Sequence, residues 1–319
     1  MDLNAGPGMP EGTLRREDPD SELARQLGGA LWSLVCSVGV RLDAALPVSG
    51  GTYSGYQPNA FRLQFADGRT LKGRRVDTSR QAEEVEYVSR CLGYRGLPRV
   101  LARRGRALLT EWIEGQPLTA DRCDRQVLRQ CGALQGFAHS QPLPADGAAP
   151  PSGTIESCRA GVERGLDALV ESALLDERVG SSAAELARAY APRGCALGFT
   201  YVDFCADNIV LKASGDVCVV DNETLSIQPC DYDLGRTWYR WPMPRSDRET
   251  YFSGYRDHRQ PADFLAHFPF WAIAAVVDGA LFRARRGGAA AAAVPVQRLH
   301  TLVHDFERGV AAEDAVFLS

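Results

Sequence analysis

Two carboxylates and an amide stand close together in the sequence, each at the end of a predicted strand. Asp203 and Asn208 are five residues apart, where a strand at 196–201 runs into a loop, and Asp221 ends the hairpin that follows. This spacing places the three side chains at one edge of a small sheet. One carboxylate can receive a hydroxyl proton, while the other, with the amide, can hold Mg²⁺ on a nucleotide phosphate. These groups are the ones that phosphoryl transfer needs.

The rest of this segment follows a recognisable order. It reads Tyr-Val-Asp-Phe-Cys-Ala-Asp-Asn from residue 201, then a hairpin, then Asp-Asn-Glu from 221, and it ends with Cys-Asp-Tyr-Asp-Leu at 230–234. The order resembles the aminoglycoside phosphotransferase family, whose pattern is His-x-Asp-x-x-x-x-Asn, a hairpin and Asp-x-Gly/Glu. The resemblance covers about 46 to 241. It implies an α+β, bilobal, protein-kinase-like fold, with an antiparallel sheet plus one helix in the N-lobe and a mostly helical C-lobe.

The resemblance also implies roles for single residues. Asp203 matches the catalytic base, while Asn208 and Asp221 match the ligands of Mg²⁺. Asp233 matches an aspartate that braces the catalytic loop. Tyr201 stands where the family has His, so we expect it to support the loop, with its ring packed underneath and its hydroxyl hydrogen-bonded to a backbone or carboxylate group.

The N-lobe contributes a candidate for the phosphate-binding lysine. Lys72 lies on a predicted strand at 70–76, where the family has the lysine that anchors ATP. Only two of the 36 basic residues are lysines, so a lysine at this place is informative. Arg74 lies two residues further on and faces the same way, which makes it the rival candidate.

A helix is predicted after this strand, at 81–92, with Val88 and Leu92 on its inward face. In the family, a glutamate of this helix pairs with the lysine. Glu84 lies on or beside the inward face and is the preferred partner of Lys72, while Glu83 and Glu86 stay open as alternatives.

Two backbone segments complete the predicted nucleotide site. The strand that contains Glu111 and Ile113 resembles the hinge that binds adenine through its backbone. A Gly/Ser-rich loop at 49–55 would cover the phosphates with its N–H groups. The loop residues predicted to do so are Ser49, Gly50, Gly51 and Thr52.

Hydrophobic periodicity supplies the elements that position these residues. Residues 1–19 are rich in Gly, Pro and charge and are expected to be disordered. A helical stripe follows from Ser21 to Val38, and residues 46–113 read as β-β-β-α-β-β. We therefore expect an N-lobe at 20–113 and a helical C-lobe, with the catalytic loop and the acceptor site, at 114–319.

Composition excludes several other classes of protein. The 319 residues carry 36 Lys+Arg against 40 Asp+Glu, a net charge of −4, so no basic excess indicates a nucleic-acid partner. The nine cysteines are scattered without a C-x-x-C pair, which argues against a zinc site. No signal peptide or membrane span is predicted, so we expect a cytoplasmic protein with no membrane partner; the sequence does not fix its oligomeric state.

The acceptor is less defined than the nucleotide. Asp231 begins the Asp-Tyr-Asp-Leu segment ten residues after Asp221, which leaves no room for a long activation segment. This favours a small-molecule acceptor of antibiotic, sugar, nucleoside or amino alcohol type, with ATP or GTP as the donor. Residues 222–319 hold 12 Asp+Glu and 11 Arg, so no cationic substrate is demanded. The alternatives are a kinase acting on Ser/Thr of a precursor peptide and a pseudokinase-like binding module.

Overall fold

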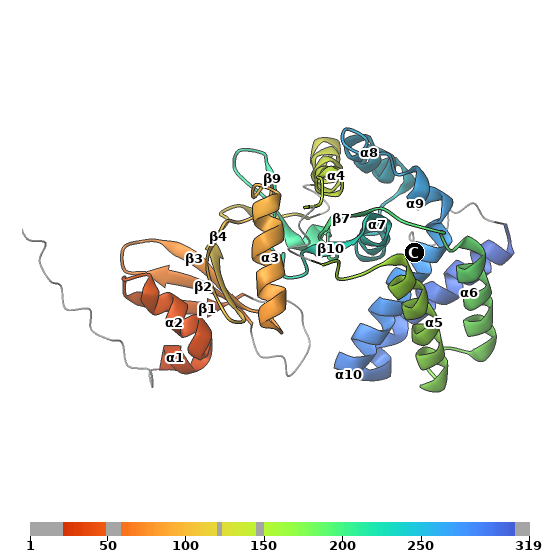
Figure 1. Cartoon of the computed structure of the whole chain (residues 1–319), viewed down its shortest axis with the longest axis horizontal. Helices are drawn as coiled ribbons and strands as arrows, with labels where there is room; N and C mark the ends of the chain where they lie inside the picture. Colours follow the sequence, from red (N-terminus) through yellow and green to blue (C-terminus); the bar gives the residue numbers. More distant parts are fainter. Residues whose placement is uncertain (1–21, 49–58, 120–122, 145–149, 310–319) are drawn as a thin grey trace, which may run out of the picture.

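The protein folds into two lobes, with a sheet-rich N-lobe and a helical C-lobe (Figure 1). The computed structural model describes residues 22–48, 59–119, 123–144 and 150–309. The segment 1–19, expected to be disordered, lies outside these ranges. The predicted fold class, a bilobal protein-kinase-like architecture, is confirmed.

The N-lobe is built on a five-stranded sheet with the order β1-β2-β3-β5-β4, and each neighbouring pair is antiparallel. Apolar side chains alternate along the strands, as in β2, where Phe61, Leu63 and Phe65 are buried. The sequence assigned no residues to a strand ahead of the Gly/Ser loop; the structure places β1 there. The strands are β1 (Leu42–Pro47), β2 (Ala60–Phe65), β3 (Thr70–Arg75), β4 (Val100–Arg104) and β5 (Ala107–Glu111).

Helices lie on both sides of this sheet. The single helix predicted at the start of the chain is two helices, α1 (Glu22–Leu27) and α2 (Gly29–Ser37), because Gly28 between them has φ 74°. They bury their apolar side chains against the sheet in a core of the N-lobe's own. Helix α3 (Ser79–Cys91), predicted at 81–92, instead joins the core of the C-lobe and stands between the two lobes (Figure 1).

The C-lobe is mainly helical, as predicted. In the part of the chain that the structure describes, no helix is long and apolar enough to cross a membrane. The helices are α4 (Arg125–Ser140), α5 (Ile155–Glu171), α6 (Glu177–Tyr190), α7 (Cys230–Arg240), α8 (Arg245–Tyr255), α9 (Ala262–Ala266) and α10 (Phe268–Glu307).

Short strands of the C-lobe present the loop that contains Asp203. The predicted strands are present as β7 (Leu197–Thr200), β8 (Ile209–Leu211) and β9 (Val217–Val219), and the last two form the expected hairpin. Two further strands were not predicted: β6 pairs with β8, and β10 pairs with β7. The two additional strands are β6 (Gln116–Pro117) and β10 (Ser226–Pro229).

Helices α4 and α8 approach each other through glycines. A methyl group added at Gly132 on α4 would meet the backbone carbonyl of Tyr251 on α8, and one added at Gly254 on α8 would meet that of Arg129 on α4. The two backbones therefore touch without intervening side chains. This close packing fixes α4, which carries two residues of the loop support described below.

We expect Gly132→Ala to lower the free energy of unfolding by about 1–3 kcal/mol, the usual cost of overpacking, because the new methyl group meets backbone that cannot turn aside. Gly161 on α5 is the matched control, since no atom lies within 4 Å of its Cβ position. Gly161→Ala should raise stability by up to about 1 kcal/mol through helix propensity. Urea unfolding of both variants measures the difference, and equal effects would contradict the close packing.

Candidate active site

The loop between β7 and β8 has an unusual backbone next to Asp203. Val202 has φ 63°, in the left-handed region, where a β-branched residue is rarely found. Asp233, in the first turn of α7, holds this conformation with its carboxylate. Its Oδ1 accepts a hydrogen bond from the Val202 amide at 2.5 Å, and its Oδ2 accepts one from the Tyr201 amide at 3.1 Å. The strained residue is thus fixed by contacts outside its own loop.

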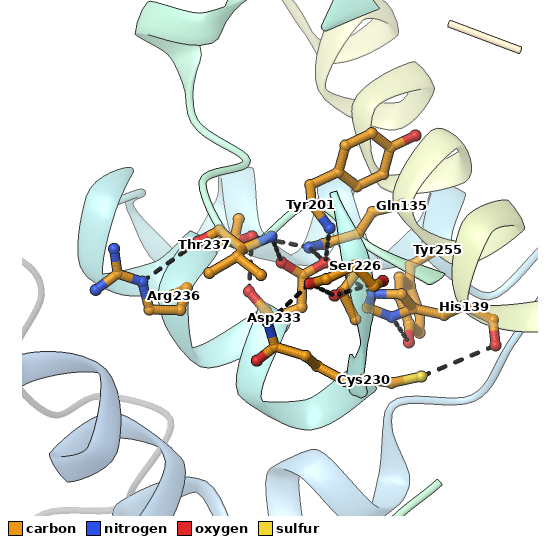
Figure 2. A network of polar contacts seen from close by, with 12 residues as sticks. Gln135, His139, Tyr201, Ser226, Cys230, Asp233, Arg236, Thr237 and Tyr255 are labelled. Carbon is orange, nitrogen blue, oxygen red and sulfur yellow. Dashed lines mark hydrogen bonds and ion pairs between the residues drawn. The ribbon is translucent and has the colours of Figure 1, made fainter. Parts of the chain in front are cut away.

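The same carboxylate also binds two side chains of α4 (Figure 2). Gln135 donates to Oδ2 of Asp233 through Nε2 at 3.0 Å, and Nε2 of His139 lies 2.8 Å from the same oxygen. His139 reaches Tyr255 of α8 through its other ring nitrogen, at 2.9 Å. The Asp233 side chain has no exposed surface, so these donors replace its hydration. His139 thus supports the loop from α4.

Tyr201 supports the loop differently from the expectation. Its ring packs against Phe204, with 5.0 Å between ring centroids, and its carbonyl accepts a hydrogen bond from Thr224 at 2.6 Å. The ring points away from Asp233 (Figure 2). The expected hydrogen bond of its buried hydroxyl is absent from the described residues. The support is therefore given by the backbone and the ring.

Asp203 and Asn208 are joined directly. The Asn208 amide nitrogen donates to the Asp203 carbonyl at 2.9 Å and to Oδ2 of its carboxylate at 3.0 Å. This orientation leaves Oδ1 of Asn208 as the atom that can bind a cation. The Asn208 carbonyl accepts from the Val220 amide at 2.8 Å, which places the residue before Asp221 beside the loop.

Two cations of β3 meet the Asp221 end of the hairpin. Arg74 forms an ion pair with Oδ1 of Asp221, and Lys72 donates to the Val220 carbonyl at 2.5 Å. Both basic side chains are buried. The sequence preferred Lys72 over Arg74 as the phosphate-binding residue. The structure brings both to the site and gives the contact with Asp221 to Arg74.

The titration of these groups reflects burial and charge together. Burial lowers the pKa of Lys72 to about 7, and the neighbouring Arg74 charge acts in the same direction. Burial raises the pKa of Asp221, but Arg74 and Lys72 outweigh it and hold that pKa below its ordinary value. Asp221 is therefore ionised and suited to a cation.

Glu223 is a site residue that sequence reasoning did not single out. Its Oε2 lies 3.5 Å from Nη1 of Arg74. Burial raises its pKa, although the charge of Arg74 opposes the shift. The signal was present in the Asp-Asn-Glu run, which places a second carboxylate two residues after Asp221.

The predicted pairing of Lys72 with Glu84 is not found in the structure. Glu84 accepts a hydrogen bond from the Ser152 hydroxyl and another from the Ile227 amide at 3.4 Å. The Glu84 side chain therefore connects α3 to the C-lobe and not to Lys72 on β3.

The two alternative glutamates of α3 are engaged elsewhere as well. Glu86 and Glu83 both pair with Arg103 of β4, at 2.7 and 3.2 Å. In the described part of the chain, the acidic groups near Lys72 come instead from the C-lobe, in Asp221 and Glu223.

The remaining nucleotide contacts are only partly covered by the structure. Ser49, Gly50, Gly51 and Thr52 lie outside the described residues. The Glu111 amide donates to the Arg99 carbonyl at 3.0 Å, so this end of β5 is held in the sheet. No described residue accepts a hydrogen bond from the Ile113 amide, which follows the strand.

The donor set fits Mg²⁺ bound together with phosphate. The described ranges contain no group of three or more His, Cys, Asp or Glu able to hold a metal by themselves. Mg²⁺ is commonly bound by one or two protein oxygens together with substrate phosphates and water. Oδ1 of Asn208 and the ionised Asp221 carboxylate match that requirement.

A comparison with protein families identifies the class to which this chain belongs. The profile described as "Phosphotransferase enzyme family" (APH) matches residues 54–265, and the chain belongs to that family. No curated protein sequence matches the chain significantly.

Solved structures agree on the fold. A type I macrolide 2′-phosphotransferase has a TM-score of 0.62 at 13% identity, covering 88% of this chain and 97% of its own. Choline kinase LicA from Streptococcus pneumoniae has a TM-score of 0.62 at 11% identity, covering 86% and 98%. A putative aminoglycoside phosphotransferase from Ralstonia eutropha JMP134 has a TM-score of 0.60 at 14% identity, covering 88% and 98%. At these identities the likeness shows the fold alone.

We expect Asp233→Asn to lower the free energy of unfolding by about 3 kcal/mol, because an amide cannot accept from all the donors that converge on the carboxylate. Asp167 on α5 is exposed and serves as the matched control. Asp167→Asn should change stability by less than about 0.5 kcal/mol. Chemical denaturation of both variants tests this, and two equally small changes would contradict the bracing role of Asp233.

The lowered pKa of Lys72 predicts a pH dependence of nucleotide binding. The ammonium is charged below about pH 7 and becomes neutral above it. Affinity for Mg·ADP should therefore fall from pH 7 to pH 9, with a slope that approaches about tenfold per pH unit. Calorimetry on wild type and Lys72→Arg makes the comparison, since arginine stays charged and should flatten the profile. Parallel profiles would show that Lys72 does not contact the phosphates.

Proposed function

We propose that the protein transfers the γ-phosphate of ATP or GTP to a hydroxyl group of a small molecule. The observation that carries the proposal is the contact of Arg74 with Asp221 across the lobes, beside the linked pair Asp203 and Asn208. This contact brings Lys72 and Arg74, the proposed cations for the phosphates, next to Asn208 and Asp221, the proposed oxygen ligands of a metal. The carboxylate of Asp203 lies beside them. Phosphoryl transfer depends mainly on such positioning and charge.

The nucleotide is proposed to lie between the lobes, with its phosphates at Lys72 and Arg74. Mg²⁺ held by Asn208 and Asp221 would neutralise charge on the phosphates as it develops. Arg74, which pairs with Asp221 in this structure, would then turn to the phosphate oxygens. The Ile113 amide is the proposed donor to the adenine or guanine ring.

Asp203 is the proposed base. It orients the acceptor hydroxyl, whose oxygen forms a bond to the γ-phosphorus while the bond from that phosphorus to the β–γ bridging oxygen breaks. The hydroxyl proton passes to Asp203 late, because a loose transition state needs little base strength. The nucleoside diphosphate leaves with the bridging oxygen.

The short link between Asp221 and α7 supports a small acceptor. Helix α7 begins at Cys230, and Asp233 on it already holds the loop of Asp203 in place. The site is thus assembled without a regulatory segment. The structural neighbours named above for macrolides and choline are consistent with acceptors of small-molecule size.

A thermal-shift comparison of Mg·ATP and Mg·GTP tests the nucleotide half of the proposal. Release of nucleoside diphosphate over a panel of hydroxyl compounds then tests the transfer. Stabilisation by a nucleotide that requires Mg²⁺, followed by release that depends on an acceptor, is the expected result. The absence of any Mg²⁺-dependent nucleotide binding would contradict the proposal.

We expect Asp203→Asn to reduce turnover by about 10²–10⁴-fold, the usual contribution of a general base, with Mg·nucleotide affinity nearly unchanged. Tyr201→Phe is the comparison, because it removes only a hydroxyl that has no partner in the described residues. It should keep most activity. Steady-state turnover of both variants distinguishes the role of Asp203 from that of the Tyr201 hydroxyl. If Asp203→Asn stays active while Tyr201→Phe is inactive, the two roles are inverted.

A further inference from the structure

Two arginines of α7 face the carboxylate that is proposed as the base. Nε of Arg240 lies 3.4 Å from Oδ1 of Asp203, and Nη2 of Arg236 lies 3.9 Å from the same oxygen. The arginines are four residues apart, so they share one face of the helix. The other carboxylate oxygen accepts from Asn208. Oδ1 of Asp203 thus faces two cations at ion-pair distance and has no hydrogen-bond partner in the described residues.

Arg236 is held in place by neutral groups. Its Nε donates to the Val202 carbonyl at 3.3 Å, its Nη1 donates to the Ala275 carbonyl at 3.5 Å, and its guanidinium lies over the Tyr239 ring. The side chain is 15% exposed. Its direction is thus fixed, and within the described residues its one ion pair is the 3.9 Å contact with Asp203.

Arg240 is the more accessible of the two, with 28% of its side chain exposed. Its Nη2 donates to the buried sulfur of Cys205 at 3.6 Å. Burial lowers the pKa of Arg240, but Asp203, Cys205 and Asp207 together outweigh it, and the net pKa is raised. Two full positive charges thus converge on one carboxylate that the reaction needs.

Other acidic groups lie near these arginines but form no ion pair with them in the described residues. Asp207 and Asp221 interact with the Arg240 charge at longer range. Asp278 accepts the hydroxyl of Tyr232. A third guanidinium, Arg298, lies on the Tyr239 ring and donates to the Tyr239 carbonyl at 2.7 Å. At ion-pair distance, the described charged groups that face Asp203 are therefore cations.

We propose that the acceptor carries an anionic group, a carboxylate or a phosphate ester, which binds Arg236 and Arg240 while its hydroxyl binds Asp203. This substrate class rests on the phosphotransferase function proposed above. Guanidinium groups match the planar, bidentate geometry of such anions better than any other side chain does. A compound with the two groups a few bonds apart would span the distance from the arginines to the base.

The anion would also replace the charge that the reaction removes. Oδ1 of Asp203 has no hydrogen-bond partner in the described residues, so the acceptor hydroxyl can donate to it. Once the proton reaches Asp203, a neutral acceptor would leave the arginines without this ionic partner, whereas an anionic acceptor supplies a new one. An ammonium acceptor would face two like charges. The arrangement thus selects for anions in both binding and reaction, unlike a site for choline or a polycationic antibiotic.

Four probes of similar size test the charge preference: glycerate, glycerol 3-phosphate, the uncharged glyceramide and the cationic 3-amino-1,2-propanediol. Each is titrated by NMR into the protein saturated with Mg·ADP. We expect at least one anionic probe to bind about 10- to 100-fold tighter than glyceramide, the size of a charge-assisted hydrogen bond, and the amine to bind weakest. The better of the two anions tells whether the group is a carboxylate or a phosphate.

Variants of Arg240, the more exposed of the two arginines, test whether this residue causes the preference for anionic probes. Arg240→Gln should remove most of the preference for the anion and leave Mg·ADP affinity unchanged, while Arg240→Lys should keep part of it. Arg164, exposed on α5, is the control, and Arg164→Gln should behave as wild type. Equal binding of the four probes, a preference for the amine, or no probe binding in a protein that binds Mg·ADP normally would overturn the substrate class alone. Failure to bind Mg·ADP would overturn the proposed function as well.

Discussion

The site depends on one buried carboxylate. Asp233 accepts hydrogen bonds from two successive loop amides and from two side chains of α4, and its side chain is fully enclosed. A buried charge is stable only when its donors are all in place, so the loop, α4 and α7 are fixed relative to one another. Val202, the residue before Asp203, keeps its left-handed conformation while its amide donates to this carboxylate.

The second constraint is the contact between the lobes. Arg74 and Lys72 come from β3, and their partners Asp221, Val220 and Glu223 all come from the C-lobe. The cations therefore meet Asp221 without a glutamate of α3. Arg74 and Asp221 form an ion pair. In the proposed function, phosphate and Mg²⁺ would replace this pair, with phosphate binding Arg74 and Mg²⁺ binding Asp221.

Sequence reasoning recovered the parts of the site that are local. Asp203, Asn208 and Asp221 are fixed by a loop and the hairpin after it, so their spacing was sufficient to predict that they converge. Lys72 and Arg74 were harder to rank, because residues two apart on a strand face the same side. Only the register between the lobes decides which of them reaches Asp221.

Contacts between distant elements could not be predicted. The partner of Glu84 depends on how far α3 lies from β10, and no local pattern encodes that distance. Strands β6 and β10 have two and four residues, which is too short for a periodic signal. Arg236 and Arg240 had the spacing of one helical face, but their position beside Asp203 became visible only in the fold. The two-helix start of the N-lobe follows from the positive φ of Gly28, which the apolar periodicity of this segment does not encode.

The central claim is that Asp221 holds a metal-bound nucleotide between the lobes. Calorimetric binding of ADP with Mg²⁺ and with a chelator, for wild type and Asp221→Asn, tests it directly; Asp216→Asn, at an exposed position in the preceding hairpin, is the control. The account predicts binding that requires Mg²⁺ in wild type and in the control, and loss of that Mg²⁺-dependent binding in Asp221→Asn. Equal Mg²⁺-dependent affinity in all three proteins would contradict it.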